Sequence, residues 1–149
     1  DGFAVANFLK KYHLKKFELL RNNDVVFKDN DYTQKNIRIQ KSPIIKTNKH
    51  DDIEEIRINL GAMGTLDIDP KIMNNFYEAY TLFYKQLHSK KFQIDFKLKA
   101  GDILCFDNRR VLHGRKEFDP NSGNRHLQGY YIEREEIKSK LNYLNKVKF

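Results

Sequence analysis

Short runs of strand character, most of them alternating apolar and polar residues, constrain the fold of this 149-residue chain more than any other feature. Alternation of this kind is typical of strands that bury one face. The runs lie at 25–27, 36–40, 43–47, 55–60, 92–98, 103–106 and 125–133. Because they surround one strongly amphipathic helix, we expect a mainly β fold with flanking α-helices, either a barrel or a double-sheet jelly roll.

Apolar residues at three- and four-residue spacing predict the helices. The first twenty residues predict two short helices, with Asp1 as an N-cap and a stop at 22–24. The clearest helix opens at Asp69-Pro70 and continues to Leu87, and its aromatic stripe is expected to pack against a sheet. A last amphipathic helix is expected from Arg134 to Val147.

The connections are predicted from turn-forming residues. Asn48 to Asp52 is expected to be a polar turn, and Gly61 to Gly64 a flexible connection. A third turn at 100–102 is expected to join the runs 92–98 and 103–106 as a hairpin.

Composition excludes several classes of protein. The net charge of +8 comes from scattered lysines that do not form one block, so a nucleic-acid interface is not expected, although an anionic small molecule is compatible with it. No apolar run approaches the roughly 20 residues of a membrane helix, so we expect a soluble protein. The single Cys105, inside an apolar run, is expected to be a buried thiol and excludes a disulfide framework. Since the first residue is Asp1, we expect a processed product or a fragment.

The stretch from Gly101 to Glu133 is the strongest candidate for a site. His113 follows the strand-like run 103–106 and is a structural histidine or a metal ligand. In an extended run, Arg125, Gly129 and Tyr131 share one face, and an arginine inside a barrel is costly unless it meets an anion. Its rigid fork of donors suits a carboxylate.

Two segments of this stretch, GDILCFDNRRVLHGRKEF and RHLQGYYIEREEI, resemble the C-terminal region of the gamma-butyrobetaine dioxygenase and trimethyllysine dioxygenase family. These are iron(II)- and 2-oxoglutarate-dependent oxygenases of the taurine-dioxygenase-like superfamily. DGF at the start and FYEAYTLFYKQL at 76–87 resemble the family more weakly. The resemblance implies a double-stranded β-helix (jelly-roll) core that is incomplete at its N-terminus, with residues 1–149 as the C-terminal part of the catalytic domain.

The resemblance also implies roles for individual residues. His113 matches the distal iron ligand, Arg125 the arginine that grips 2-oxoglutarate, and Tyr131 an aromatic that helps to enclose a trimethylammonium group, to which cation–π attraction contributes about 0.5–2 kcal/mol. The implied cofactors are Fe(2+), 2-oxoglutarate as co-substrate, and ascorbate as reductant. The implied reaction is hydroxylation of gamma-butyrobetaine to carnitine, coupled to decarboxylation of 2-oxoglutarate to succinate.

Other readings stay open from the sequence. One is trimethyllysine dioxygenase activity, and another is a non-enzymatic basic binding module that keeps the fold. The expected partner is a quaternary-ammonium small molecule, with no nucleic acid and no membrane, and a homodimer is one open state of assembly. A cytoplasmic location is expected, with a mitochondrial one as the alternative.

The chain departs from the family pattern in three places. The iron-binding pair is not matched, because the one His-x-Asp pattern in the sequence, His50-Asp51-Asp52, lies in the predicted polar turn, where His50 is expected to be solvated; two of the three iron ligands are therefore expected to be missing and this chain alone is expected to be inactive. Arg109 stands where the family usually has tryptophan, and Leu60-Gly61-Ala62 stands where it has Asn-Asn. The polar residues around His113 are expected to brace a turn by mutual hydrogen bonds: Asp107, Asn108, Arg110 and Arg115.

Overall fold

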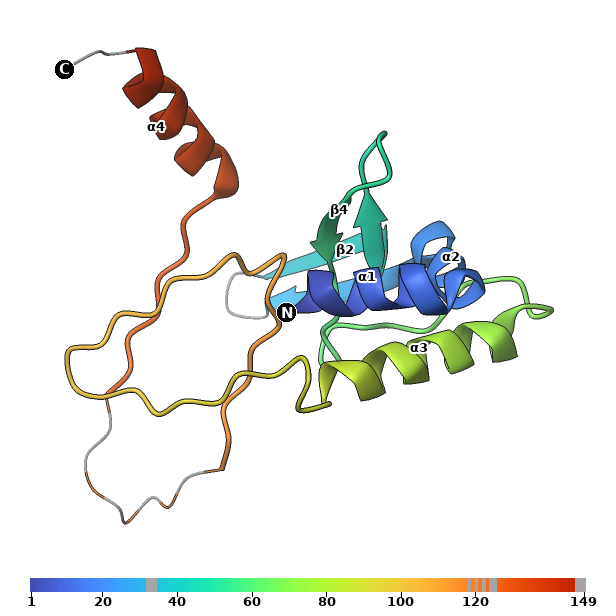
Figure 1. Cartoon of the computed structure of the whole chain (residues 1–149), viewed down its shortest axis with the longest axis horizontal. Coiled ribbons are helices and arrows are strands. Elements are labelled where there is room, and N and C mark those ends of the chain that lie inside the picture. The colour runs from blue at the N-terminus through green and yellow to red at the C-terminus, as the bar shows by residue number, and fades with distance from the viewer. Residues whose placement is uncertain (32–34, 118, 120, 122, 124–125, 147–149) are drawn as a thin grey trace. The chain divides into compact units, whose positions relative to one another are not determined.

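A computed structural model describes residues 1–31, 35–117, 119, 121, 123 and 126–146. The chain forms two compact units, Asp1–Gly114 and Arg115–Phe149 (Figure 1). The first unit contains α1 (Gly2–Tyr12), α2 (Leu14–Asn22), β1 (Asp24–Asp31), β2 (Asn36–Pro43), β3 (Ile45–Thr47), β4 (Ile53–Ile56) and α3 (Met73–Leu87). The second contains α4 (Arg134–Lys146).

The two N-terminal helices form as the sequence predicts. The Asp1 carboxylate caps α1 by accepting hydrogen bonds from the backbone N–H groups of Phe3 (3.0 Å) and Ala4 (3.3 Å). α2 ends at Asn22, at the predicted stop. The buried residues of the two helices recur at helical spacing: Val5, Ala6, Leu9, Phe17 and Leu20.

α3 contributes one apolar face of the core. Phe76, Ala79 and Phe83 are buried along one side of it, as the aromatic stripe predicts. The helix begins at Met73, three residues after Pro70. Its main contacts are with α2 and α1 (Figure 1). The expectation that it packs mainly against a sheet is therefore wrong. The physical reason is that α1 and α2 bring apolar faces of matching spacing to the same core.

The strands form two separate antiparallel pairs. β1 pairs with β2 in a register that places Val25 opposite Ser42, and β3 pairs with β4 with Ile45 opposite Ile56. These strands confirm the predicted runs at 25–27, 36–40 and 43–47, with Ile44 between two strands, whereas the predicted run at 55–60 is a strand only at 55–56, because β4 spans Ile53–Ile56. The sheets do not close into a barrel or a jelly roll in the described residues.

The segment from Gly61 to Gly64, expected to be a flexible connection, is hydrogen-bonded to β1. The backbone N–H of Lys28 donates to the Ala62 carbonyl at 2.7 Å, and the Gly64 N–H donates to the Val26 carbonyl at 2.8 Å. The free edge of β1 offers unpaired backbone groups, and this segment satisfies them in the manner of a short third strand.

The predicted polar turn between β3 and β4 is confirmed, and it is tied to both N-terminal helices. The Asn48 side chain accepts hydrogen bonds from the backbone N–H groups of His50 and Asp52. Asp51 forms ion pairs with Lys10 of α1 and Arg21 of α2. The hydrogen bond and charge of Lys10, with the charge of Arg21, hold the pKa of the Asp51 carboxyl below its usual value.

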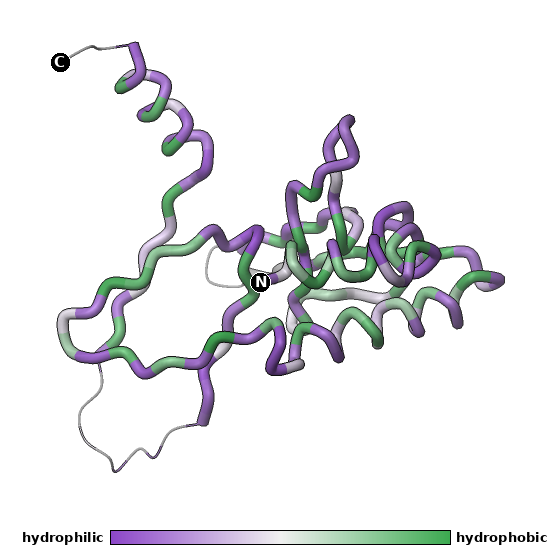
Figure 2. Tube along the Cα trace, viewed as in Figure 1, coloured by the Kyte–Doolittle hydropathy of each residue, from purple (hydrophilic) through white to green (hydrophobic). Residues whose placement is uncertain are grey.

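The runs at 92–98, 103–106 and 126–133 are not strands in the described residues, so the predicted hairpin and third strand are wrong there. The predicted turn at 100–102 does form, with the Lys99 N–H donating to the Asp102 carboxylate at 2.7 Å. A strand requires a hydrogen-bonded partner, and the described chain pairs none with these runs. Figure 2 shows apolar residues recurring along the segment that follows α3. Most are exposed, as is Cys105, which corrects the expected buried thiol.

The predicted C-terminal helix is confirmed as α4 from Arg134 to Lys146, whereas Val147 lies outside the described residues. Ile137, Leu141 and Leu144 are partly exposed along it. No helix in the described part of the chain has the length and apolar character that a membrane crossing needs.

The exposure pattern predicts a large loss of stability when one phenylalanine of this chain is truncated and almost none when another is. Phe76→Ala removes a side chain that is 1% exposed in the core, so the free energy of unfolding should fall by about 3–5 kcal/mol. Phe96→Ala is the matched control, since that ring is 61% exposed, and its effect should stay within about 0.5 kcal/mol. Urea unfolding followed by circular dichroism measures both. Equal losses would contradict the placement of the core.

Candidate functional site

The residues before His113 form a tight turn organised by Asp107. Its carboxylate accepts a hydrogen bond from the backbone N–H of Arg109 at 2.9 Å. Its carbonyl accepts from the N–H groups of Arg110 at 3.0 Å and Val111 at 2.9 Å. The prediction that Asp107 braces this turn is therefore confirmed, but the bonds go to the backbone of the turn itself.

Arg110 attaches the turn to the start of α1. Its guanidinium forms an ion pair with the Asp1 carboxylate at 2.7 Å, and its carbonyl accepts the Gly2 N–H at 3.0 Å. The backbones approach so closely that a Cβ on Gly2 would lie 2.9 Å from the Arg110 carbonyl oxygen, which requires glycine there. Arg110 therefore braces the turn from within only through its backbone N–H, which donates to the Asp107 carbonyl, whereas the partner of its side chain is 109 residues away in sequence.

Arg109 attaches the same turn to β4. Its Nη1 lies 2.7 Å from Oε2 of Glu55, and its carbonyl accepts the backbone N–H of Ile56 at 2.8 Å. The turn before His113 is therefore held at one end of α1 and along β4, both elements of the packed core.

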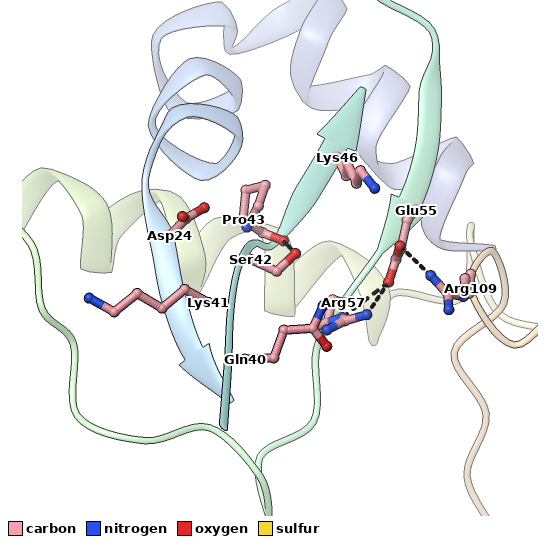
Figure 3. A pocket seen from close by; sticks show the side chains of 9 residues that line it. All are labelled: Asp24, Gln40, Lys41, Ser42, Pro43, Lys46, Glu55, Arg57 and Arg109. Atoms are coloured by element: carbon pink, nitrogen blue, oxygen red, sulfur yellow. Dashed lines mark hydrogen bonds and ion pairs between the residues drawn. The ribbon is translucent and has the colours of Figure 1, made fainter. Parts of the chain in front are cut away.

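Glu55 is the centre of a charged cluster that the sequence did not reveal. Its carboxylate is nearly buried and also accepts two hydrogen bonds from Arg57, at 3.0 and 2.7 Å (Figure 3). Burial acts to raise the pKa of Glu55, but the hydrogen bonds and charges of Arg57 and Arg109 outweigh it and hold that pKa below its usual value. The carboxylate therefore stays ionised and keeps both guanidinium groups oriented.

His113 lies just after this turn and is exposed. Its ring contacts the Phe106 ring, with centroids 4.7 Å apart and planes tilted by 55°. Leu112, the residue before it, is partly buried against the hydrophobic core. The chain thus fixes the backbone on one side of His113 and leaves the imidazole accessible.

The other two predicted site residues belong to the second unit. Arg125 lies outside the described residues, so its role stays a prediction. Tyr131 is 80% exposed, and the described backbone at Gly129 and Tyr131 is not a strand, so the strand expected to carry these two residues is absent there. The aromatic role of Tyr131 also stays a prediction.

The donors present do not suffice for a metal ion. Within the described ranges, no three histidine, cysteine, aspartate or glutamate side chains gather into a group that could hold one. His113 is a suitable imidazole donor, but a mononuclear iron site of the facial type needs two further ligands. The described residues therefore do not form an iron site by themselves, and no reaction step at a metal follows from their geometry.

Part of the Glu55 cluster could have been found in the sequence. In the run at 55–60, Glu55 and Arg57 are two residues apart and therefore share a strand face. Nothing local indicates that Arg109, 54 positions further on, joins them. The contact of Arg110 with Asp1 is equally invisible to local patterns.

Comparison with known proteins gives a family match over most of the chain. Residues 1–131 match the family described as taurine catabolism dioxygenase TauD, TfdA family. The matched range includes the turn before His113 and both elements that hold it.

Three curated relatives are similar along almost the whole chain. Gamma-butyrobetaine dioxygenase from Pseudomonas sp. (strain AK-1) is 35% identical over 146 residues, which cover 98% of this chain and 38% of the relative. Human gamma-butyrobetaine dioxygenase is 31% identical over 147 residues, 97% of this chain and 38% of the relative. Trimethyllysine dioxygenase from Meyerozyma guilliermondii is 32% identical over 150 residues, 97% and 36%. The chain spans little more than a third of the length of these relatives.

The Glu55 cluster predicts a stability difference that depends on pH. Glu55→Gln removes the charge that holds two arginines, so the free energy of unfolding at pH 7 should fall by about 2 kcal/mol. Because the folded-state pKa of Glu55 is depressed, its contribution is fully present above the ordinary value of 4.5 and is lost as the pH falls through the folded-state pKa. The gap between native and variant should therefore narrow below that value.

Urea titrations of both proteins between pH 3.5 and 7 measure this gap. Glu54→Gln is the matched control, since Glu54 is an exposed neighbour on the same strand, and it should be neutral throughout. A gap that is constant with pH would contradict the assignment.

Proposed function

Because the chain belongs to the taurine catabolism dioxygenase TauD, TfdA family, we propose that it is the C-terminal part of an iron(II)- and 2-oxoglutarate-dependent dioxygenase that hydroxylates gamma-butyrobetaine. The observation that carries the proposal is the family match over residues 1–131, which includes the FDNRRVLHGR turn. The similarity of 35% and 31% to two gamma-butyrobetaine dioxygenases supports the choice of substrate.

The proposal assigns a role to the apolar runs that form no strand in the described residues. In a complete jelly roll, the runs at 92–98, 103–106 and 125–133 would pair with strands from the remainder of the protein. Ile94, Phe96, Ile103 and Leu104 are between 51% and 94% exposed in this chain. We expect another part of the complete protein to cover these exposed apolar side chains.

The site roles follow from the same assignment. His113 would supply one imidazole ligand to iron, and residues outside this chain would supply the other two. Arg125 would hold the distal carboxylate of 2-oxoglutarate through a two-donor contact, and Tyr131 would line the pocket for the quaternary ammonium group. The bound iron supplies the oxidising chemistry, with ascorbate as its reductant. The chain's own contribution is the rigid turn that fixes the backbone at His113.

Trimethyllysine is the second candidate substrate. The relative from Meyerozyma guilliermondii, a trimethyllysine dioxygenase, is 32% identical over nearly the same range. That identity is close to the values for the two gamma-butyrobetaine dioxygenases. Both substrates carry the same cationic headgroup, so an aromatic contact at Tyr131 would not discriminate between them. Discrimination would fall to the groups that bind the rest of the substrate.

A non-enzymatic binding module remains the alternative of another class. The net charge of +8 and the exposed lysines would then serve an acidic partner. A homodimer and a cytoplasmic or mitochondrial location are further expectations for the complete protein.

The test of this proposal is succinate formation from 2-oxoglutarate by the complete protein, with Fe(2+), ascorbate and each quaternary-ammonium substrate in turn. We expect turnover with gamma-butyrobetaine exceeding that with trimethyllysine. His113→Ala should abolish turnover at every 2-oxoglutarate concentration, because it removes an iron ligand. Arg125→Ala should raise the KM for 2-oxoglutarate well above native, with a smaller effect on the KM for the substrate.

Each outcome distinguishes a different alternative. Greater turnover with trimethyllysine would replace the first substrate by the second. No succinate with either substrate would favour the binding module. Undiminished activity of His113→Ala, in a protein with native circular dichroism, would refute the ligand assignment.

A further inference from the structure

A surface pocket of about 460 Å³ lies beside the Glu55 cluster, entirely within the first unit. It is formed where β2, β3, β4 and the turn before His113 meet (Figure 3). The charged side chains that line it are Asp24, Lys41, Lys46, Glu55, Arg57 and Arg109. Four of these are cationic and two are anionic.

Glu55 holds the two arginines without exhausting their donors. Arg57 uses Nε and Nη2, and Arg109 uses Nη1 toward the same carboxylate. Each guanidinium carries five N–H donors, so several on each remain for a ligand. Arg57 is fixed further by stacking on Phe27, with its guanidinium carbon 5.6 Å from the ring centroid. The two forks are thus oriented before any ligand arrives, which lowers the entropic cost of binding.

Lys46 adds a cation at the same place. It lies opposite Glu55 in the register of β3 and β4, so both side chains are on one face of the strand pair. Among the described residues, no carboxylate forms an ion pair with it within 4 Å, and its side chain is exposed. Lys41, in contrast, is paired with Asp67 at 3.0 Å. Asp24 lies on the other side of the pocket from Arg109 in Figure 3.

We propose that Arg57, Arg109 and Lys46 form a binding site for a small oxyanion with two or more terminal oxygens, either a phosphate group or a dicarboxylate. Planar guanidinium forks match such anions with two parallel N–H···O bonds, and the lysine adds a point charge. Arg109 belongs to the turn that precedes His113, so the anion would bind against the segment that positions that histidine.

The site stands apart from the proposed oxygenase activity. It requires none of the residues assigned to iron or 2-oxoglutarate, and its test contains no metal. Failure of one proposal therefore leaves the other untouched.

The test is a titration of the 149-residue chain at pH 7, followed by the backbone amide resonances. Inorganic phosphate and malonate are added separately, and sodium chloride at matched ionic strength is the reference. We expect saturable shifts confined to 40–46, 55–57 and 107–110, with a Kd on the order of 1 mM. Lys46→Gln should weaken binding about fivefold, because it removes one nearby charge and breaks no ion pair.

Two further variants separate the site from a general charge effect. Lys49→Gln removes an exposed lysine from the turn of the same hairpin and should leave the Kd unchanged. Arg109→Lys keeps the charge but loses the fork, and should weaken binding severalfold with the rest of the spectrum unperturbed. Saturation by only one of the two anions would support the site and identify its ligand. Linear shifts that chloride reproduces, or equal weakening by Lys46→Gln and Lys49→Gln, would overturn the proposal.

Discussion

The ion pairs of Glu55 with Arg57 and Arg109 are the interaction on which the candidate site depends. A nearly buried carboxylate without partners would be costly, and two arginines compensate that cost, each bonded to a different oxygen of the carboxylate. One of them lies beside Glu55 in sequence, and the other belongs to the turn that leads to His113. The same contact therefore satisfies the core and fixes the segment that carries the proposed metal ligand.

The turn is also attached at a second point, by the ion pair between Arg110 and Asp1. The Asp1 carboxylate accepts hydrogen bonds from the first backbone N–H groups of α1 and also pairs with Arg110. The start of the first helix and the turn therefore stabilise each other. Arg109 brings a second guanidinium into the pocket beside β4, and this is the structural basis of the proposed oxyanion site.

The sequence predicted the packed half of the chain better than the half that carries the site. Helical spacing located Phe17, Phe76 and Phe83 correctly, because each helix buries a face whose period is visible locally. The prediction of strands after α3 was wrong for a physical reason. Alternation at 92–98 indicates a tendency to form a strand, but a strand also needs a hydrogen-bonded partner strand, and the described residues provide none. The family resemblance proposed His113 and Arg125, yet the contacts of Arg109 span 54 residues and no local pattern encodes them.

A double-mutant cycle between Glu55 and Arg109 tests the central claim most directly. The free energies of unfolding are measured for the native chain, Glu55→Gln, Arg109→Gln and the double variant. If the pair joins β4 to the turn before His113, the two effects should be non-additive by about 1 kcal/mol, allowing for the partial exposure of Arg109. Strict additivity, with a coupling energy near zero, would contradict the account.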